Sequence, residues 1–118
     1  MGISLKFGFG SGKEKAVAKS ETRLRDAIAR KVCITASYDR GPIHLFEPYA
    51  LLQSSDNGSA ILLAVRMDGP AGPSSHEDLA ELEVSKLGLL EVTSQEFTPD
   101  PRFNVRDPKY GGTVVATV

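Results

Sequence analysis

The sequence lacks the residues from which most catalytic and metal sites are built. Its 118 residues contain no tryptophan, one cysteine and two histidines. The lone Cys33 can form no internal disulfide, and with the well-separated His44 and His76 it cannot build a zinc site, so we expect a small buried hydrophobe. No nucleophile with a base, and no pair of carboxylates, stands at a recognisable spacing. We therefore expect a non-catalytic protein with no metal and no other cofactor.

Long apolar runs are absent as well. No stretch approaches the roughly 20 apolar residues that a membrane-spanning helix needs, and residues 1–15 lack the continuous apolar segment of a secretory signal. A composition of 41% hydrophobic and 25% charged residues is typical of a globular protein, and the length suits one domain. We expect a single-domain soluble protein that stays in the cytoplasm and does not enter the membrane.

Charge is divided unevenly, although the net charge is only −1. Residues 1–31 hold eight basic and three acidic residues, a net charge of +5, and the rest holds six basic and twelve acidic residues, a net charge of −6. The two parts could attract each other within one molecule or across an oligomer, or the basic part could attract phosphate. Because the basic residues are interleaved with acids, we favour a solvated helix face.

A helix is indicated by residues 12–31, which are rich in alanine, lysine, glutamate and arginine. Ser11 and Glu14 have the spacing of a capping box. In this motif each side chain accepts a hydrogen bond from a backbone N–H that the helix would otherwise leave unpaired. Apolar side chains fall near one face, at Val17, Leu24 and Ile28. The sequence therefore predicts an amphipathic helix over 12–31, preceded by a flexible segment over 1–11.

Beyond the helix the apolar pattern takes the period of two that is typical of strands. Asp56-Asn57-Gly58 favours a hairpin turn, and residues 68–78 are rich in Gly, Pro and Ser, as in a surface loop. Gly88 is expected to break or bend the chain between the last two strands. A helix capped within Ser75–Asp78 is an alternative to the fourth strand. We expect strands at Val32–Tyr38, Ile43–Gln53, Ala60–Met67, Leu79–Leu87 and Leu89–Thr93.

A helix followed by five short strands with tight turns predicts a mainly β fold, a small partly open barrel over residues 32–105. Pro48 lacks an N–H, so we place it at a bulge or a sharp bend of the second strand, where the neighbouring Glu47 could accept backbone amides. The extension over 106–118 ends in TVVATV. This end suits an edge strand, or a segment given to a neighbouring chain in a homodimer.

The order of these segments resembles that of the WYL domain, a small Sm-like or SH3-like five-stranded β-barrel of bacterial regulators. Glu47-Pro48-Tyr49 is similar to the family's Glu-Pro-Tyr element, and residues 97–103 are similar to its two-phenylalanine ending. The resemblance covers roughly residues 20–105. Its segments are Leu24–Tyr38, Phe46–Leu52, Ala60–Val65, Glu81–Val92 and Gln95–Phe103.

The resemblance implies a regulatory module of transcription that senses an effector, such as a nucleotide or single-stranded nucleic acid, and acts on a partner regulator. The chain departs from the family at two places. The Trp-Tyr-Leu tripeptide is replaced by Ala60-Ile61-Leu62, which removes two rings on which a base could stack, and Glu83 stands where the family often has arginine. The alternative is a structural module for oligomerisation, without a small-molecule ligand.

The resemblance places Tyr38 and Tyr49 near the expected ligand face, and Lys86 at a basic position. Tyrosines in strands more often belong to the core with a satisfied hydroxyl, and we favour that interpretation for both. Arg66 and Lys86 could bind an anion, or could be surface residues paired with acids. Glu47 and Pro48 are expected to be structural, with the carboxylate partly buried and hydrogen-bonded.

Overall fold

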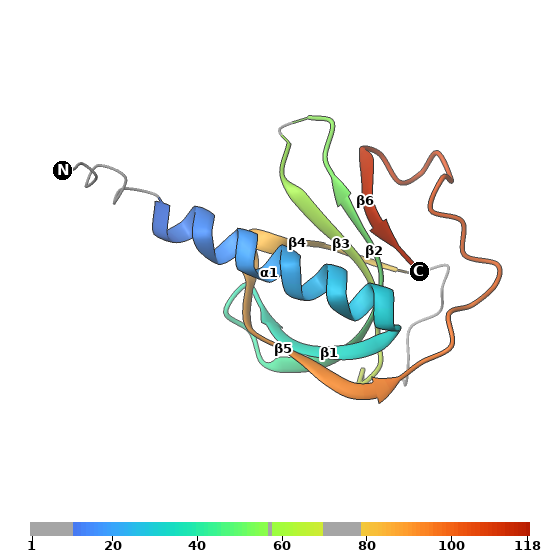
Figure 1. Cartoon of the computed structure of the whole chain (residues 1–118), viewed down its shortest axis with the longest axis horizontal. Coiled ribbons are helices and arrows are strands. Elements are labelled where there is room, and N and C mark those ends of the chain that lie inside the picture. Colours follow the sequence, from blue (N-terminus) through green and yellow to red (C-terminus); the bar gives the residue numbers. More distant parts are fainter. Residues whose placement is uncertain (1–10, 57, 70–78) are drawn as a thin grey trace.

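The computed structural model describes residues 11–56, 58–69 and 79–118, with side chains from Ala16 onward. In this part of the chain one helix, α1 (Ser11–Arg30), precedes antiparallel strands that form a single open sheet (Figure 1). The strands are β1 (Val32–Tyr38), β2 (Ile43–Gln53), β3 (Ala60–Arg66), β4 (Ala80–Glu83), β5 (Leu87–Glu96) and β6 (Thr113–Thr117), and the 3-10 turn η3 (Val84–Lys86) joins β4 to β5. The predicted mainly β fold with a leading helix is confirmed.

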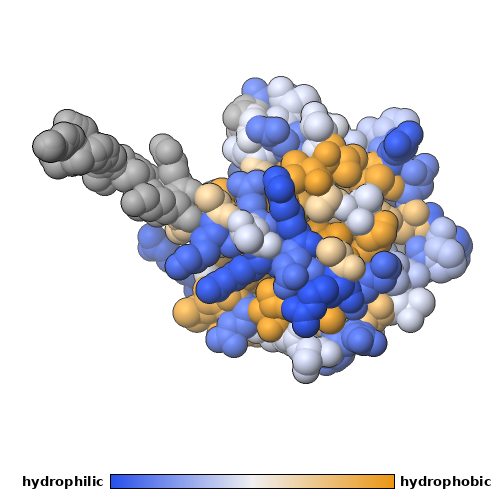
Figure 2. Space-filling model, viewed as in Figure 1, coloured by the Kyte–Doolittle hydropathy of each residue, from blue (hydrophilic) through white to orange (hydrophobic). Residues whose placement is uncertain are grey.

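Helix α1 covers Ser11–Arg30 and so agrees with the predicted 12–31 to within one residue. Lys31 ends it with a left-handed φ of 55°, and its N–H donates to the Ile28 carbonyl (3.2 Å), as in many C-terminal caps. The outward side of α1 is hydrophilic, which confirms the solvated helix face (Figure 2). The predicted capping box and flexible first segment lie outside the described side chains. The described residues hold no helix whose length and hydropathy suit a bilayer crossing.

Strand β2 bends at its proline. It pairs with β1 through Ile43–Phe46, with β3 through Phe46–Gln53 and with β6 through Ala50–Gln53. The register against β3 shifts between Pro48 and Ala50, so one extra residue forms a bulge where the proline has no N–H to offer the ladder. The predicted bulge at Pro48 is confirmed, and β2 is a curved strand shared by three neighbours.

The turn between β2 and β3 is the predicted hairpin. Gly58 has a φ of 73°, and its N–H donates to the Ser54 carbonyl (3.0 Å), while the Ser54 N–H donates to Ser59 (2.8 Å). Asn57 itself lies outside the described residues. The same is true of His76 and of the helix start considered at Ser75–Asp78.

The fourth strand is shorter than predicted, and at Gly88 the chain bends without breaking: the register against β1 shifts there, and Leu89 has a left-handed φ of 52°. In place of one strand over Leu79–Leu87, β4 ends at Glu83 and η3 follows, because Val84 turns into the core with 1% of its surface exposed. Gly88 lies within β5 and pairs with Ser37. A Cβ at Gly88 would lie 2.9 Å from the Ser37 hydroxyl, so this glycine permits the close approach of β1 and β5.

The last residues complete the sheet of their own chain. β6 pairs with the second half of β2, with Leu51 opposite Ala116 and Gln53 opposite Thr113. Of the two predicted alternatives for TVVATV, the structure therefore shows an edge strand within the chain. Residues 97–112, called the C-terminal strap below, connect β5 to β6.

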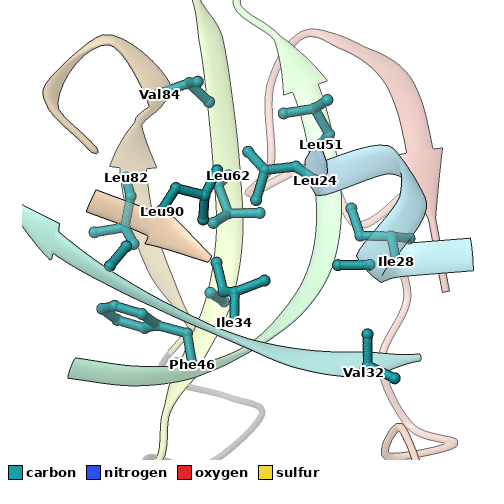
Figure 3. Close-up of a cluster of buried hydrophobic side chains, with 13 residues drawn as sticks. Leu24, Ile28, Val32, Ile34, Phe46, Leu51, Leu62, Leu82, Val84 and Leu90 are labelled. Carbon is teal, nitrogen blue, oxygen red and sulfur yellow. The ribbon is translucent and has the colours of Figure 1, made fainter. Parts of the chain in front are cut away.

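Both faces of the sheet are covered. On the inner face, α1 packs against the strands, and the largest buried side chains there include Leu24, Ile28, Ile34, Leu51 and Leu62 (Figure 3). On the outer face a smaller cluster of Ala50, Leu52 and Leu63 packs against Phe103, Val105 and Tyr110 of the C-terminal strap. Strand β3 is thus buried on both sides, as its continuous apolar sequence predicts.

Candidate ligand recess and strand-edge groove

Two neighbouring hollows open where β5 begins. The recess, about 360 Å³, is formed by the end of β1, the β1–β2 turn and η3. The β5 groove, about 780 Å³, lies between the first half of α1 and β5. The recess is lined by Ser37, Asp39, Arg40, Ser85 and Lys86, and both hollows share Leu87 and Gly88.

The backbone beside the recess forms a tight turn. Asp39 and Arg40 take left-handed φ values of 51° and 64°. The Gly41 N–H donates to the Tyr38 carbonyl (2.9 Å) and closes the turn, while the Asp39 N–H donates to the Lys86 carbonyl (3.0 Å) and ties the turn to η3. Positive φ at both central residues is typical of a type I′ turn, a common connection between two antiparallel strands. The turn holds Asp39 and Arg40 beside η3.

Cations and hydroxyl groups meet in the recess. Lys86 Nζ lies 3.0 Å from the Glu83 carboxylate. The hydrogen bond and charge of Glu83, followed by the charge of Asp39, raise the pKa of Lys86, so the ammonium stays protonated at neutral pH. Arg40 adds a guanidinium, two serines of the lining add hydroxyl groups, and Asp39 adds a carboxylate. The cations and hydroxyl groups are donors of the kind that bind the oxygens of an anion, and the carboxylate opposes such binding.

Of the four ligand-binding residues predicted from the sequence, Lys86 lines the recess and Tyr38 lies beside it, outside the lining. The Tyr38 hydroxyl accepts the N–H of Glu83 (3.1 Å), and Glu83 is the ion-pair partner of Lys86. Tyr38 is half-buried and packs against the inner core. Its hydroxyl is satisfied, as in the interpretation we favour, and Tyr38 positions η3 beside the recess.

Tyr49 lies under the C-terminal strap. Its side chain is 3% exposed, and its ring stacks on Phe97 with 5.7 Å between ring centres and meets Phe103 edge-on at 5.0 Å. The hydroxyl accepts the N–H of Asp100 (2.9 Å). Burial, the largest effect, raises the pKa of Tyr49. The core interpretation with a satisfied hydroxyl is confirmed for Tyr49, which anchors the C-terminal strap.

Arg66 lines neither the recess nor the β5 groove and lies at the end of β3. Its Nε lies 3.4 Å from Asp68, which also lies 3.3 Å from His44 Nδ1. Desolvation tends to raise the pKa of Asp68, but hydrogen bonds from the Leu45 amide, His44 and Arg66 outweigh it and lower the pKa. Arg66 is thus paired with an acid, the second of the two predicted interpretations. Arg66 forms an ion pair with Asp68 and Lys86 with Glu83, so the two cations do not converge on one carboxylate.

Glu47 does not make the predicted hydrogen bonds. Within the described residues no N–H donates to its carboxylate, because Pro48 has none and the amides of β2 are used in pairing with its neighbouring strands. The side chain is half-buried, and burial raises its pKa. Cys33 is fully buried, as expected, and burial followed by the charge of Glu47 raises the pKa of its thiol.

Sequence reasoning missed Arg23, Arg40 and Leu89. Arg23 Nη1 donates to the Leu90 carbonyl across the β5 groove (3.0 Å). Leu89 is 72% exposed, with a left-handed φ of 52°. Lys19 and Arg23, four residues apart, share a face of the basic helix, and this spacing could have pointed to the groove. For Leu89 the sequence carries no such signal.

Comparison of the chain with protein-family models, with curated proteins and with solved structures gives no match. The recess and the β5 groove are therefore interpreted from their own residues. The resemblance to the WYL domain stays a prediction.

Proposed function

We propose that the chain is a non-catalytic, cytoplasmic ligand-sensing module of the WYL type. It takes the phosphate of a nucleotide or of single-stranded nucleic acid in the recess and acts on a partner regulator of transcription. The observation that carries this proposal is the meeting of Arg40, Lys86 and two serine hydroxyls around one hollow. These groups come from β1, the turn after it and η3, and together they match the oxygens of a phosphate.

The sheet supports a small Sm-like or SH3-like barrel as the framework of this site. The strand order is β4-β3-β2-β1-β5, so the chain returns after η3 to pair beside β1. That return places η3 against the β1–β2 turn through the hydrogen bond between Asp39 and Lys86. The bent β2, shared by β1, β3 and β6, curls the sheet in the way that closure of a small barrel requires.

The recess is better suited to a phosphate than to a base. Its described lining supplies no aromatic ring, and Ala60-Ile61-Leu62 holds none where the family has two. Stacking on an aromatic ring, worth about 1–3 kcal/mol per base, is therefore not offered there. We expect weak discrimination between bases and affinity that falls steeply with added salt.

Titration with labelled single-stranded oligonucleotides and with nucleoside triphosphates at two salt concentrations tests the proposal. A variant carrying Arg40→Asn and Lys86→Gln should bind at least tenfold more weakly, because two cations of the recess are lost. Asn tolerates the left-handed backbone of position 40, so the turn is kept.

The matched control removes two cations elsewhere, with Lys109→Gln and Arg106→Gln in the exposed C-terminal strap. It should keep the affinity of the native chain to within about twofold, because surface charges distant from the ligand are screened at physiological salt. Absence of saturable, salt-sensitive binding by the native protein would overturn the proposal. Equal weakening by the two variants would place the ligand outside the recess.

A second candidate function, assembly into a homo-oligomer, is favoured by free strand edges. β4 and β5 are the last strands of the order at either side, so each has an unpaired edge within the described residues. Such edges are templates for pairing with another chain. Sedimentation velocity over a hundredfold range of concentration distinguishes the two functions. A sedimentation coefficient that rises with concentration supports assembly, and a constant monomer value contradicts it.

A further inference from the structure

The β5 groove lies between a wall of α1 and the free edge of a strand. From α1 come Lys19 and Arg23, about one helical turn apart, with the small side chains of Ala16 and Ser20 beside them. The other wall is a run of consecutive residues of β5, Leu87–Val92. In the described sheet β5 is the last strand on this side and pairs with β1 alone. Such an edge is a template for pairing with another chain.

A bulge in β5 turns a leucine outward at this groove. Leu89 and Leu90 together face Ala36 of β1, because the pairs on either side leave one residue in β1 and two in β5. Leu89 has a left-handed φ of 52° and is 72% exposed, whereas Leu90 is buried in the inner core. Figure 2 shows apolar surface beside the hydrophilic side chains of α1, on the side where β5 begins. The groove therefore offers aliphatic surface to an occupant.

A backbone acceptor of β5 is turned toward α1. The Leu90 carbonyl accepts a hydrogen bond from Arg23 Nη1 across the groove (3.0 Å). A guanidinium carries five N–H donors, so Arg23 can bind a carboxylate as well as this carbonyl. A strand laid in the groove would find a carbonyl of the kind that pairs strands, held beside a cation.

The two cations of the groove are not neutralised within the described part of the chain. The ion pairs found among the described residues involve other basic side chains. Glu91 also lines the groove, but it forms none of these pairs with Lys19 or Arg23. A carboxylate brought by an occupant would therefore meet two available cations, and charge-assisted hydrogen bonds of this kind are among the stronger ones.

The lining favours a peptide over a nucleic acid. The Leu90 carbonyl and the Glu91 carboxylate are acceptors, and a phosphate has no donor to offer them. The described lining holds no aromatic ring on which a base could stack. Leu87, Leu89 and Val92 supply aliphatic surface instead, which alternate side chains of an extended peptide would cover.

We propose that the β5 groove binds an extended segment of a partner protein, in which acidic and aliphatic side chains alternate, by strand addition to β5. The backbone of the segment pairs with the edge of β5, its carboxylates bind Lys19 and Arg23, and its aliphatic side chains pack against Leu89. This deepens the proposed function, and it rests on that function for the partner being a regulator of transcription. The site itself is separate from the recess, apart from Leu87 and Gly88, which line both.

Capped peptides of about eight residues, titrated into the full-length protein, test the chemistry of the partner. A peptide of alternating glutamate and valine should bind at least tenfold more tightly than one of alternating lysine and valine, because the groove holds two cations. Its affinity should fall as salt is added. The amide NMR signals of Leu87–Val92 should shift, and those of β3 should not.

Backbone pairing is tested with two N-methylated forms of the acidic peptide. The N–H groups of alternate residues face the same edge of a strand, so methylating all the valines or all the glutamates blocks one edge or the other. One form should bind at least tenfold more weakly than the other, because only one edge meets β5. Equal affinity of the two forms would overturn strand addition.

Variants of the protein test the two walls. Lys19→Gln with Arg23→Gln should weaken binding of the acidic peptide at least tenfold. The matched variant, Arg25→Gln with Arg30→Gln, removes two cations of the same helix that do not line the groove, and it should keep the affinity to within about twofold. Leu89→Asn keeps a residue that tolerates the left-handed backbone but removes the aliphatic surface, so it should weaken binding about fivefold or more.

The recess variant Arg40→Asn with Lys86→Gln separates this inference from the ligand-sensing function. It should bind the acidic peptide like the native chain, so a recess that takes no phosphate would leave the groove proposal standing. Absence of saturable binding of the acidic peptide, or equal affinity for the basic one, would overturn the proposal. Equal weakening by the two helix variants would place the peptide elsewhere. Displacement of the peptide by a thymidine octanucleotide that shifts the same amides would assign the groove to nucleic acid.

Discussion

The two faces of the sheet are covered in different ways. On the inner face α1 satisfies its own backbone amides, so its cover is held by aliphatic side chains such as Leu24 and Ile28. The C-terminal strap on the outer face has no regular structure, and its amides donate partly to backbone carbonyls and partly to side chains. Three Asx-turns supply such side chains, at Asp100–Arg102, Asn104–Arg106 and Asp107–Lys109. The inner face therefore depends on filled volume, and the outer face on a few polar and aromatic anchors.

The largest effect is expected from a cavity in the inner face. Leu24 is fully buried between α1 and the sheet, so Leu24→Ala should lower the free energy of unfolding by about 2–5 kcal/mol. Urea denaturation measures this difference. Leu89→Ala, which removes the same atoms from a side chain that is 72% exposed, should change it by less than about 0.5 kcal/mol. Similar losses in both variants would show that α1 does not cover the inner core.

The end of the C-terminal strap should be sensitive to a single methyl group. Gly112 has a φ of 91°, and a Cβ there would lie 2.2 Å from the Gln53 carbonyl oxygen. We expect Gly112→Ala to cost about 1–3 kcal/mol and to speed hydrogen exchange in β6. The adjacent Gly111→Ala is the control, because its Cβ would meet no atom within 4 Å. Equal stability of the two variants would mean that the strap does not fix β6 in place.

A smaller effect is expected when one anchor loses only its polar atom. Tyr49→Phe keeps the ring contacts with Phe97 and Phe103 but removes the acceptor of the Asp100 N–H. The expected cost is about 1–1.5 kcal/mol, with faster proteolysis in the strap than in α1. Tyr110→Phe removes a hydroxyl from the same strap and should have less effect. Cleavage that accelerates equally in α1 would argue against separate control of the two faces.

Local patterns explain which parts of the fold could be predicted. The helix, the first three strands and the bulge at Pro48 follow from periodicity, from turn residues and from the missing N–H of proline, all of which act within a few residues. Of the predicted break or bend at Gly88, only the bend is present, because that glycine packs against Ser37, 51 residues earlier in the chain, and so stays within β5. Val84 ended the fourth strand early for a similar reason, since its place in the core depends on α1 and the distant strands.

The candidate site was predictable only in part. Of the candidate ligand-binding residues, Lys86 lines the recess, and Tyr38 is linked to it through Glu83, while their role in binding stays a prediction. Arg40 was not identified, because it comes to the recess only where η3 meets the turn, through the hydrogen bond from Asp39 to Lys86. The positions of the recess residues depend on contacts between segments that are far apart in the sequence. Patterns among neighbouring residues do not predict such contacts.

The smallest effect expected is a dependence of stability on pH. It arises from Glu47, on the outer side of β2. Burial raises the pKa of Glu47 in the folded protein above the value of about 4.3 expected in the unfolded chain. The folded state therefore binds the proton more tightly, so stability is highest below the unfolded pKa and declines as the pH rises through the folded pKa. Glu47→Gln stays neutral throughout, and it should raise the urea midpoint near pH 7 relative to the native chain, with less gain near pH 4.

Glu91→Gln is the matched control, because it makes the same change at an exposed position of β5. Its effect should differ little between the two pH values. If Glu47→Gln raises the urea midpoint equally near pH 4 and near pH 7, the effect does not come from the charge of Glu47. The shape of the side chain would then be its cause. A gain confined to neutral pH would show that the native chain keeps a half-buried carboxylate at a cost in stability. Glu47 would then differ from Tyr49, two residues later, whose polar atom holds the strap in place.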